Sequence, residues 1–258
     1  MKYSGNISRD SSSPLAVKTK CLRSRKEMIV YLSGIIQRIM VKKNVLTFLF
    51  ITSFFANAQA QVPVREEPRH KPVLQNKYIR LLDVWLPPGD TTMFHIHATP
   101  SLFVVLTNTL TTSQVMGGNW ISDRSVAGKT WYRTFIQDTL VHRVANIDTV
   151  SFHVNDIEIL SSFDALSHKA PIAFPVIFSN EKAIAYQLTK SSLNNKVIKG
   201  RGPIIAELIT GVAEFHDLDA KTVTAMQAGK YLYISPGNSF YFAPSGNGEM
   251  NMIVFEIK

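Results

Sequence analysis

The strongest constraint on the fold is a succession of short β-type segments separated by turns. Segments rich in Val, Ile, Phe and Tyr lie at 78–86, 101–106, 151–160, 183–188, 230–234 and 250–257. Turn residues separate them, as in Pro87-Pro88-Gly89-Asp90 and Ser235-Pro236-Gly237-Asn238. Short strands with such turns are typical of β-sandwiches and barrels, so the sequence predicts an all-β protein. One helix is expected, over residues 219–228.

The two halves of the chain share a weak internal repeat. Asp156-Ile157-Glu158-Ile159 aligns with Val254-Phe255-Glu256-Ile257, and Ala127-Gly128-Lys129 aligns with Ala228-Gly229-Lys230. Self-similarity of this kind predicts a duplicated structural unit. We therefore expect two barrels, at residues 61–165 and 166–258, with the connection between them inside 161–177.

The net charge of +9 belongs almost entirely to the first 60 residues. Residues 1–60 hold ten basic and two acidic side chains, whereas the remaining 198 residues hold 18 basic and 17 acidic ones. The part after residue 60 is therefore nearly neutral. Its charge gives no support to a nucleic-acid or anionic-membrane partner.

Residues 40–60 have the pattern of a secretory signal peptide. Met40-Val41-Lys42-Lys43-Asn44 is followed by an apolar run at 45–55 and by the A-x-A sites of Ala56-Asn57-Ala58-Gln59-Ala60. The run is short for an uncleaved anchor, which needs about 20 apolar residues. We expect residues 1–39 to be a start-site artefact or a disordered extension. The mature protein would then be periplasmic or secreted and would lack cysteine, because Cys21 is removed.

The segment from Gly89 to His97 carries the clearest chemical signal. In a strand, His95 and His97 project from one face and the flanking Phe94 and Ile96 from the other. Two imidazoles on one rigid strand suit Zn, Fe, Ni or Cu, although the pair needs a third ligand. His142 is the candidate.

These residues also carry a resemblance to a family. Gly89, five intervening residues and His95-x-His97 resemble the first motif of the cupin superfamily, and His142 with Asn146 resembles the end of its second. The resemblance covers nearly all of the mature chain. It implies a bicupin of two small antiparallel β-barrels, of the jelly-roll or double-stranded β-helix type. It also implies that His95, His97 and His142 bind a divalent metal inside the first barrel.

Several positions depart from the cupin pattern. The family has a Glu four or five residues after the second His, where this chain has Ser101 and Leu102, and neither can act as an anionic ligand. In the second half, Lys199-Gly200-Arg201 falls where the repeat places His95-Ile96-His97, and Phe240 falls where it places His142. The second barrel is therefore expected to hold no metal by the family's means.

Other polar residues give weaker signals. Arg80 and Gln114 are candidates for binding an anionic substrate inside the first barrel, with surface or strand-end positions as the alternative. Glu158 and Glu256 recur at equivalent positions, which favours a structural hydrogen bond. His70 is expected to be exposed. The histidines without a partner at ligand spacing are expected to have ordinary roles: His153, His168 and His216.

The leading interpretation is an exported, metal-dependent cupin that acts on a small organic molecule, in a dioxygenase-type reaction with iron. Two alternatives stay open. One is a non-catalytic module that binds a small ligand or sugar, and the other is a lyase or isomerase that uses Zn or Mn; Ni also suits such ligands. Exposed barrel edges favour a homodimer.

Overall fold

The computed structural model describes residues 30, 32–38, 40, 61–164, 169–193 and 195–258. The chain divides into two units, at residues 1–58 and 59–258. In the first unit, residues 30, 32–38 and 40 are helical. Among the described residues, no helix combines the length and the hydropathy of a membrane span. The expected signal peptide at 40–60 and the expected barrel boundary at 165/166 fall almost entirely outside the described residues.

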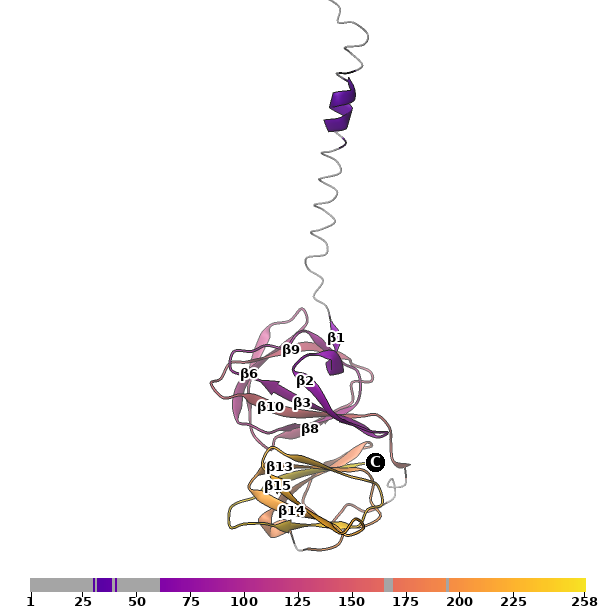
Figure 1. Cartoon of the computed structure of the whole chain (residues 1–258), viewed down its shortest axis with the longest axis vertical. Helices are drawn as coiled ribbons and strands as arrows, with labels where there is room; N and C mark the ends of the chain where they lie inside the picture. Colours follow the sequence, from indigo (N-terminus) through magenta and orange to yellow (C-terminus); the bar gives the residue numbers. More distant parts are fainter. Residues whose placement is uncertain (1–29, 31, 39, 41–60, 165–168, 194) are drawn as a thin grey trace, which may run out of the picture. The chain divides into compact units, whose positions relative to one another are not determined.

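The first barrel is built from two five-stranded sheets, with strand orders β1-β4-β9-β6-β7 and β2-β3-β10-β5-β8 (Figure 1). All pairings are antiparallel except that of β1 with β4, and the 3-10 helix η1 (Val64–Glu66) follows β1. The strands are β1 (Val62–Pro63), β2 (His70–Gln75), β3 (Ile79–Leu86), β4 (His95–His97), β5 (Ser101–Val105), β6 (Thr109–Val115), β7 (Trp120–Ser125), β8 (Thr130–Arg133), β9 (Leu140–Asn146) and β10 (Phe152–Ile159).

The second barrel repeats this arrangement. Its sheets have the orders β11-β12-β18-β13-β16 and β15-β14-β17, so the first matches β2-β3-β10-β5-β8 strand for strand. This match confirms the all-β fold and the duplication. The elements are β11 (Val176–Ser179), β12 (Ala183–Thr189), the 3-10 helix η3 (Lys190–Ser192), β13 (Ile204–Thr210), β14 (Val212–Asp217), β15 (Thr222–Gln227), β16 (Tyr231–Ile234), β17 (Phe240–Pro244) and β18 (Asn251–Ile257).

The helix expected at 219–228 is wrong. Residues 222–227 form β15, which pairs antiparallel with β14 in a hairpin. Lys221 has a φ of 57° at the turn that joins the two strands. Because Thr222, Val223 and Thr224 are β-branched, they favour the extended backbone once β14 offers a partner strand.

Strand alternation assigns each side chain of the central sheets to one of two cores. On β3, Leu82, Val84 and Leu86 pack inside the first barrel. Ile79 and Leu81 on the same strand face the other way, into a core shared with β12, β13 and β18 of the second barrel. The two barrels therefore pack sheet against sheet, which leaves the interior of the first barrel for the site.

One polar pair interrupts the core between the barrels. The side-chain amide of Asn155 on β10 donates to both carboxyl oxygens of Glu207 on β13, at 3.0 Å each. Glu207 is completely buried. Burial raises its pKa to about 8; the Asn155 hydrogen bond opposes the shift and the charge of Asp83 adds to it.

Candidate metal centre

Strand pairing brings the three histidines predicted from the sequence together. β4 lies beside β9 with His95 directly opposite His142. The ring centroid of His95 lies 5.0 Å from that of His97 and 4.6 Å from that of His142. The Nε2 atoms of His97 and His142 are 3.1 Å apart. Metal ligation by these residues stays a prediction, but their convergence inside the barrel is a property of the fold.

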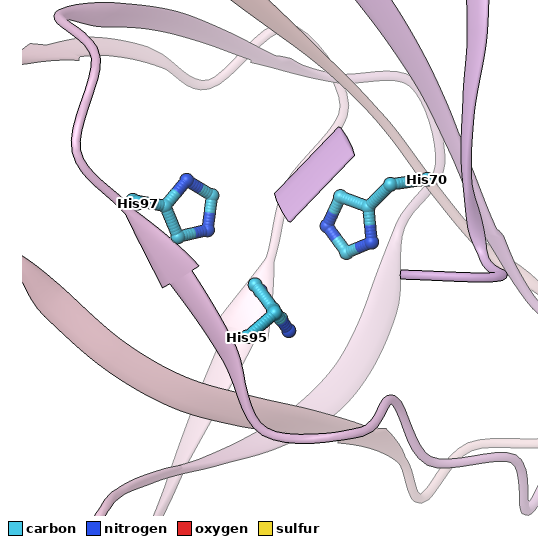
Figure 2. A group of neighbouring side chains, drawn as sticks. All are labelled: His70, His95 and His97. Atoms are coloured by element: carbon cyan, nitrogen blue, oxygen red, sulfur yellow. The ribbon is translucent and has the colours of Figure 1, made fainter. Parts of the chain in front are cut away.

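A fourth histidine joins this cluster from the opposite sheet. His70 begins β2, and its ring centroid lies 4.6 Å from that of His95. One ligand nitrogen each from His70, His95 and His97 lies within 4.8 Å of the others, and Figure 2 shows the three side chains directed at one another. The expectation that His70 is exposed is wrong, since its exposed fraction is 6%. The charged flanks Arg69 and Lys71 misled the sequence interpretation.

A buried carboxylate holds His70 in place. Glu67 Oε2 lies 2.8 Å from His70 Nδ1, and the carboxylate also accepts the backbone N–H groups of Arg69 and Met93. Burial opposes ionisation of Glu67, but these hydrogen bonds outweigh it and lower its pKa. Arg69 in turn makes a bidentate ion pair with Asp90, which fastens this segment to the turn before β4.

Protein groups behind the rings of His95 and His97 direct their Nε2 atoms into the cluster. His95 Nδ1 donates to the carbonyl oxygen of Met93 at 2.9 Å, so its Nε2 is the unprotonated nitrogen of the neutral ring. That Nε2 is buried and has no hydrogen-bond partner among the residues that the structure describes. His97 Nδ1 faces Asp156 Oδ2 at 3.4 Å, an electrostatic contact slightly longer than a hydrogen bond. Acceptors behind metal-bound imidazoles play the same orienting role in known metal sites.

Two histidines of the cluster, His95 and His142, resist protonation. The pKa of His95 falls to about 3 and that of His142 to about 2, in both cases chiefly through burial and then through the neighbouring histidines. Both rings are therefore neutral at pH 7, the form in which imidazole binds metal ions. The buried Nε2 of His95, beside the neutral ring of His142, fits a divalent ion that prefers nitrogen ligands.

The carboxylate missing from the cupin motif is not supplied at the expected positions. Ser101 donates its hydroxyl to the carbonyl of Thr99, and Leu102 packs in the core between the barrels. Asp156 on β10 instead places a carboxyl group beside His97, with 1% of its surface exposed. The sequence analysis did not select Asp156 as a site residue. The repeat aligns it with Val254, a difference between the halves that could have drawn attention to it, but its contact with His97 appears only in the fold.

Phe135 fixes the position of the His97 ring. Its ring stacks on that of His97 at a centroid distance of 5.0 Å and an interplanar angle of 21°. Phe135 is buried and has a φ of 54°, in the left-handed region that bulky residues seldom adopt. Such strain persists only where the surroundings enforce it, and it is common near functional sites.

The two weaker candidates have protein partners. Arg80 donates to Glu158 at 2.6 Å and to Gln75 at 2.8 Å. Gln114 accepts a hydrogen bond from Arg143 and donates to the carbonyl of Gly118. Neither lines the cavity that reaches the histidines.

The second barrel has apolar residues in place of the His95–His142 pair. An isolated bridge joins Ile198 to Phe240, so Ile198 takes the place opposite Phe240 that the sequence repeat gave to Lys199. Arg201 makes a bidentate ion pair with the buried Glu256. Glu256 and Glu158 thus share a structural role, each binding an arginine, as expected.

The remaining histidines lie apart from the cluster. His153 contacts Asp83 at 2.6 Å on the outer face of β10, and His216 contacts Glu214 at 3.1 Å in the second barrel. His168 lies outside the described residues.

Comparisons with known proteins support the fold. No protein family model matches the chain, and no curated protein matches its sequence. Among solved structures, AerE from Microcystis aeruginosa matches with a TM-score of 0.51 and 14% identity, over 74% of this chain and 98% of that one. Ylba from E. coli matches with a TM-score of 0.50 and 9% identity, over 73% of this chain and 87% of that one. A cupin 2 conserved barrel domain protein from Leptotrichia buccalis matches with a TM-score of 0.46 and 10% identity, over 73% and 88%.

The paired sheets, repeated along the chain with a histidine cluster inside the first pair, are the cupin fold in its two-barrel form. Its likeness to AerE and Ylba is one of fold. The buried histidines of the first barrel are a candidate site for a divalent metal.

Proposed function

We propose that this protein is an exported cupin that binds one divalent metal ion in its first barrel and acts on a small organic molecule in a dioxygenase-type reaction. The observation that carries the proposal is the buried, unpartnered Nε2 of His95 inside a cluster of four imidazoles. The dioxygenase assignment rests on the cupin resemblance and on a ligand set without a carboxylate at Ser101 or Leu102. Iron is the metal that we expect.

Each residue of the cluster has a defined task in this proposal. His95, His97 and His142 would hold the ion from β4 and β9, and His70 would complete the set from β2. Iron held there would supply Lewis acidity and redox chemistry. Glu67 and the carbonyl of Met93 would orient the rings of His70 and His95 by accepting at Nδ1. Asp156 would orient the His97 ring through its electrostatic contact with Nδ1.

Elemental analysis of the purified protein tests the metal site. We expect one divalent ion per chain in the wild type, and loss of that ion in His95→Ala and His142→Ala. His216→Ala is the matched control, because His216 lies in the second barrel beside Glu214. Oxygen consumption by the iron-loaded protein would support the dioxygenase, zinc without oxygen consumption would point to a lyase or isomerase, and absence of metal under every loading condition would contradict the proposal.

The proposed location rests on the sequence pattern of residues 40–60. N-terminal sequencing of the exported protein is expected to give a start at residue 59 or 61, after one of the A-x-A sites. A mature chain that starts before residue 50 would overturn export by this signal.

We also propose that the protein forms a homodimer. The edge strand β7 supports this, since it lies at the end of its sheet and exposes Trp120 and Ile121. Light scattering on the purified protein tests this, and a monomer at high concentration would contradict it.

A further inference from the structure

A cavity of about 170 Å³ inside the first barrel reaches the histidine cluster, and its two walls differ in chemistry. One wall comes from the sheet of β3, β5, β8 and β10 and is apolar except for Asp156. The other comes from β6 and β7 and carries hydroxyl groups and the carboxylate of Asp123. The apolar wall consists of Val84, Leu86, Phe103, Trp131, Phe152 and Val154.

The apolar wall includes a flat aromatic surface. The rings of Phe103 and Trp131 stack at a centroid distance of 4.9 Å and an interplanar angle of 11°. The facing wall presents Thr111 and Ser113 of β6 and Ser125 of β7. A ligand that fits both walls has a flat apolar body and at least one neutral polar group.

The described side chains along the cavity include no lysine or arginine that could bind an anionic ligand. Two acidic residues, Asp123 and Asp156, do line it. Three basic side chains of this barrel are paired with acidic partners: Arg69 with Asp90, Arg80 with Glu158, and Lys129 with Asp123. A carboxylate that entered the cavity would lose its hydration without gaining a cationic side chain, and this costs free energy.

We propose that the walls of this cavity favour small uncharged molecules with a flat apolar body over carboxylates and phosphates when no metal ion is bound. We expect the polar group of the ligand to face the histidines, and this expectation rests on the proposed function. The selection against anions rests on the cavity walls alone. This assignment replaces the anionic substrate that Arg80 and Gln114 suggested in the sequence.

Two probes of the same size and different charge test the proposal, namely benzyl alcohol and benzoate. Titration calorimetry on the whole mature protein would measure their binding at pH 7, with the protein first treated with chelator and then loaded with Fe²⁺ under nitrogen. We expect benzyl alcohol to bind the metal-free form at least tenfold more tightly than benzoate. Bound Fe²⁺ is itself a cation that attracts carboxylates, so in the iron-loaded form we expect benzoate to bind more tightly than it does in the metal-free form. Benzoate binding the metal-free form as tightly as benzyl alcohol would overturn the proposal.

A gain-of-charge variant sharpens this test. Ser113→Arg places a cation on the cavity wall and is expected to reverse the preference in favour of benzoate. Thr112→Arg is the matched control, because Thr112 is the neighbouring residue of β6 and lies outside the cavity lining. Unchanged probe preference in a folded Ser113→Arg variant would contradict the proposal; if that variant fails to fold, the wild-type comparison decides alone.

The two proposals can fail separately. A protein that binds no metal but still prefers benzyl alcohol would contradict the proposed function and support the selection against anions by the cavity walls. A protein that binds iron, but whose metal-free form binds benzoate as tightly as benzyl alcohol, would do the opposite.

Discussion

The Nε2 atoms of His97 and His142 lie 3.1 Å apart, although 45 positions separate the two residues in the sequence. His142 is neutral at pH 7, as is the neighbouring His95. A cation bound by these nitrogens would link the two strands that carry them. Because a ligand that binds only the folded state stabilises that state, the cation would raise the free energy of unfolding.

Divalent metal is therefore expected to raise the melting temperature of the chelator-treated protein. At a free metal concentration 100 times the Kd, the gain in unfolding free energy is about 2.7 kcal/mol. Thermal melts with and without Fe²⁺ or Zn²⁺ measure it. His95→Ala should abolish the shift, and an equal shift in that variant would place the metal elsewhere.

The Glu67→Gln substitution is expected to weaken metal binding about 10- to 100-fold, since partners of this kind orient the ligating imidazoles. It removes the carboxylate that accepts from His70 and leaves a shape of similar size. Competition with a chelator of known affinity measures the change. Glu66→Gln is the control, because Glu66 is exposed and pairs only locally with Arg65. Equal affinities in the two variants would remove His70 from the site.

Asp156→Val is expected to lower the affinity for metal and to raise the stability of the metal-free protein. The buried carboxyl oxygens of Asp156 have no hydrogen-bond partner, and a buried group of this kind costs about 1 to 3 kcal/mol. The sequence repeat already places Val254 at the corresponding position of the second barrel. Denaturant unfolding of the metal-free variant should show a gain in stability, while metal titration should show weaker binding. A loss of stability would mean that Asp156 is a structural residue.

Glu207→Gln is expected to flatten the dependence of stability on pH. The folded protein keeps the Glu207 proton up to about pH 8, whereas the ordinary value is 4.5. The contribution to stability is complete below pH 4.5 and is lost as the pH rises to about 8, because only the unfolded chain releases the proton in that window.

Urea unfolding at pH 5 and pH 8 measures this effect. The difference between wild type and Glu207→Gln should change by a few kcal/mol in favour of the variant at the higher pH. Glu214→Gln is the control, since the Glu214 side chain is 40% exposed. An unchanged difference would show that Glu207 is ionised in the folded state at neutral pH.

The strands and the duplication could be predicted because they depend on local pattern. The run at 78–86 became β3 and that at 250–257 became β18, each within one residue at either end. The helix predicted over 219–228 was wrong. The β-branched residues at the centre of this segment are extended because they pair with a neighbouring strand, and their own periodicity does not determine this conformation.

By itself the sequence determined that this chain forms two related β-barrels and that His95, His97 and His142 belong to one of them. Their spacing on two strands, together with a known motif, was enough. Only the tertiary structure decided that His70 and Asp156 join them, and that Arg80 does not reach the cavity. The physical reason is that these side chains meet through pairing and packing between sheets, so their neighbours depend on strand register and barrel closure, which no local window of sequence encodes.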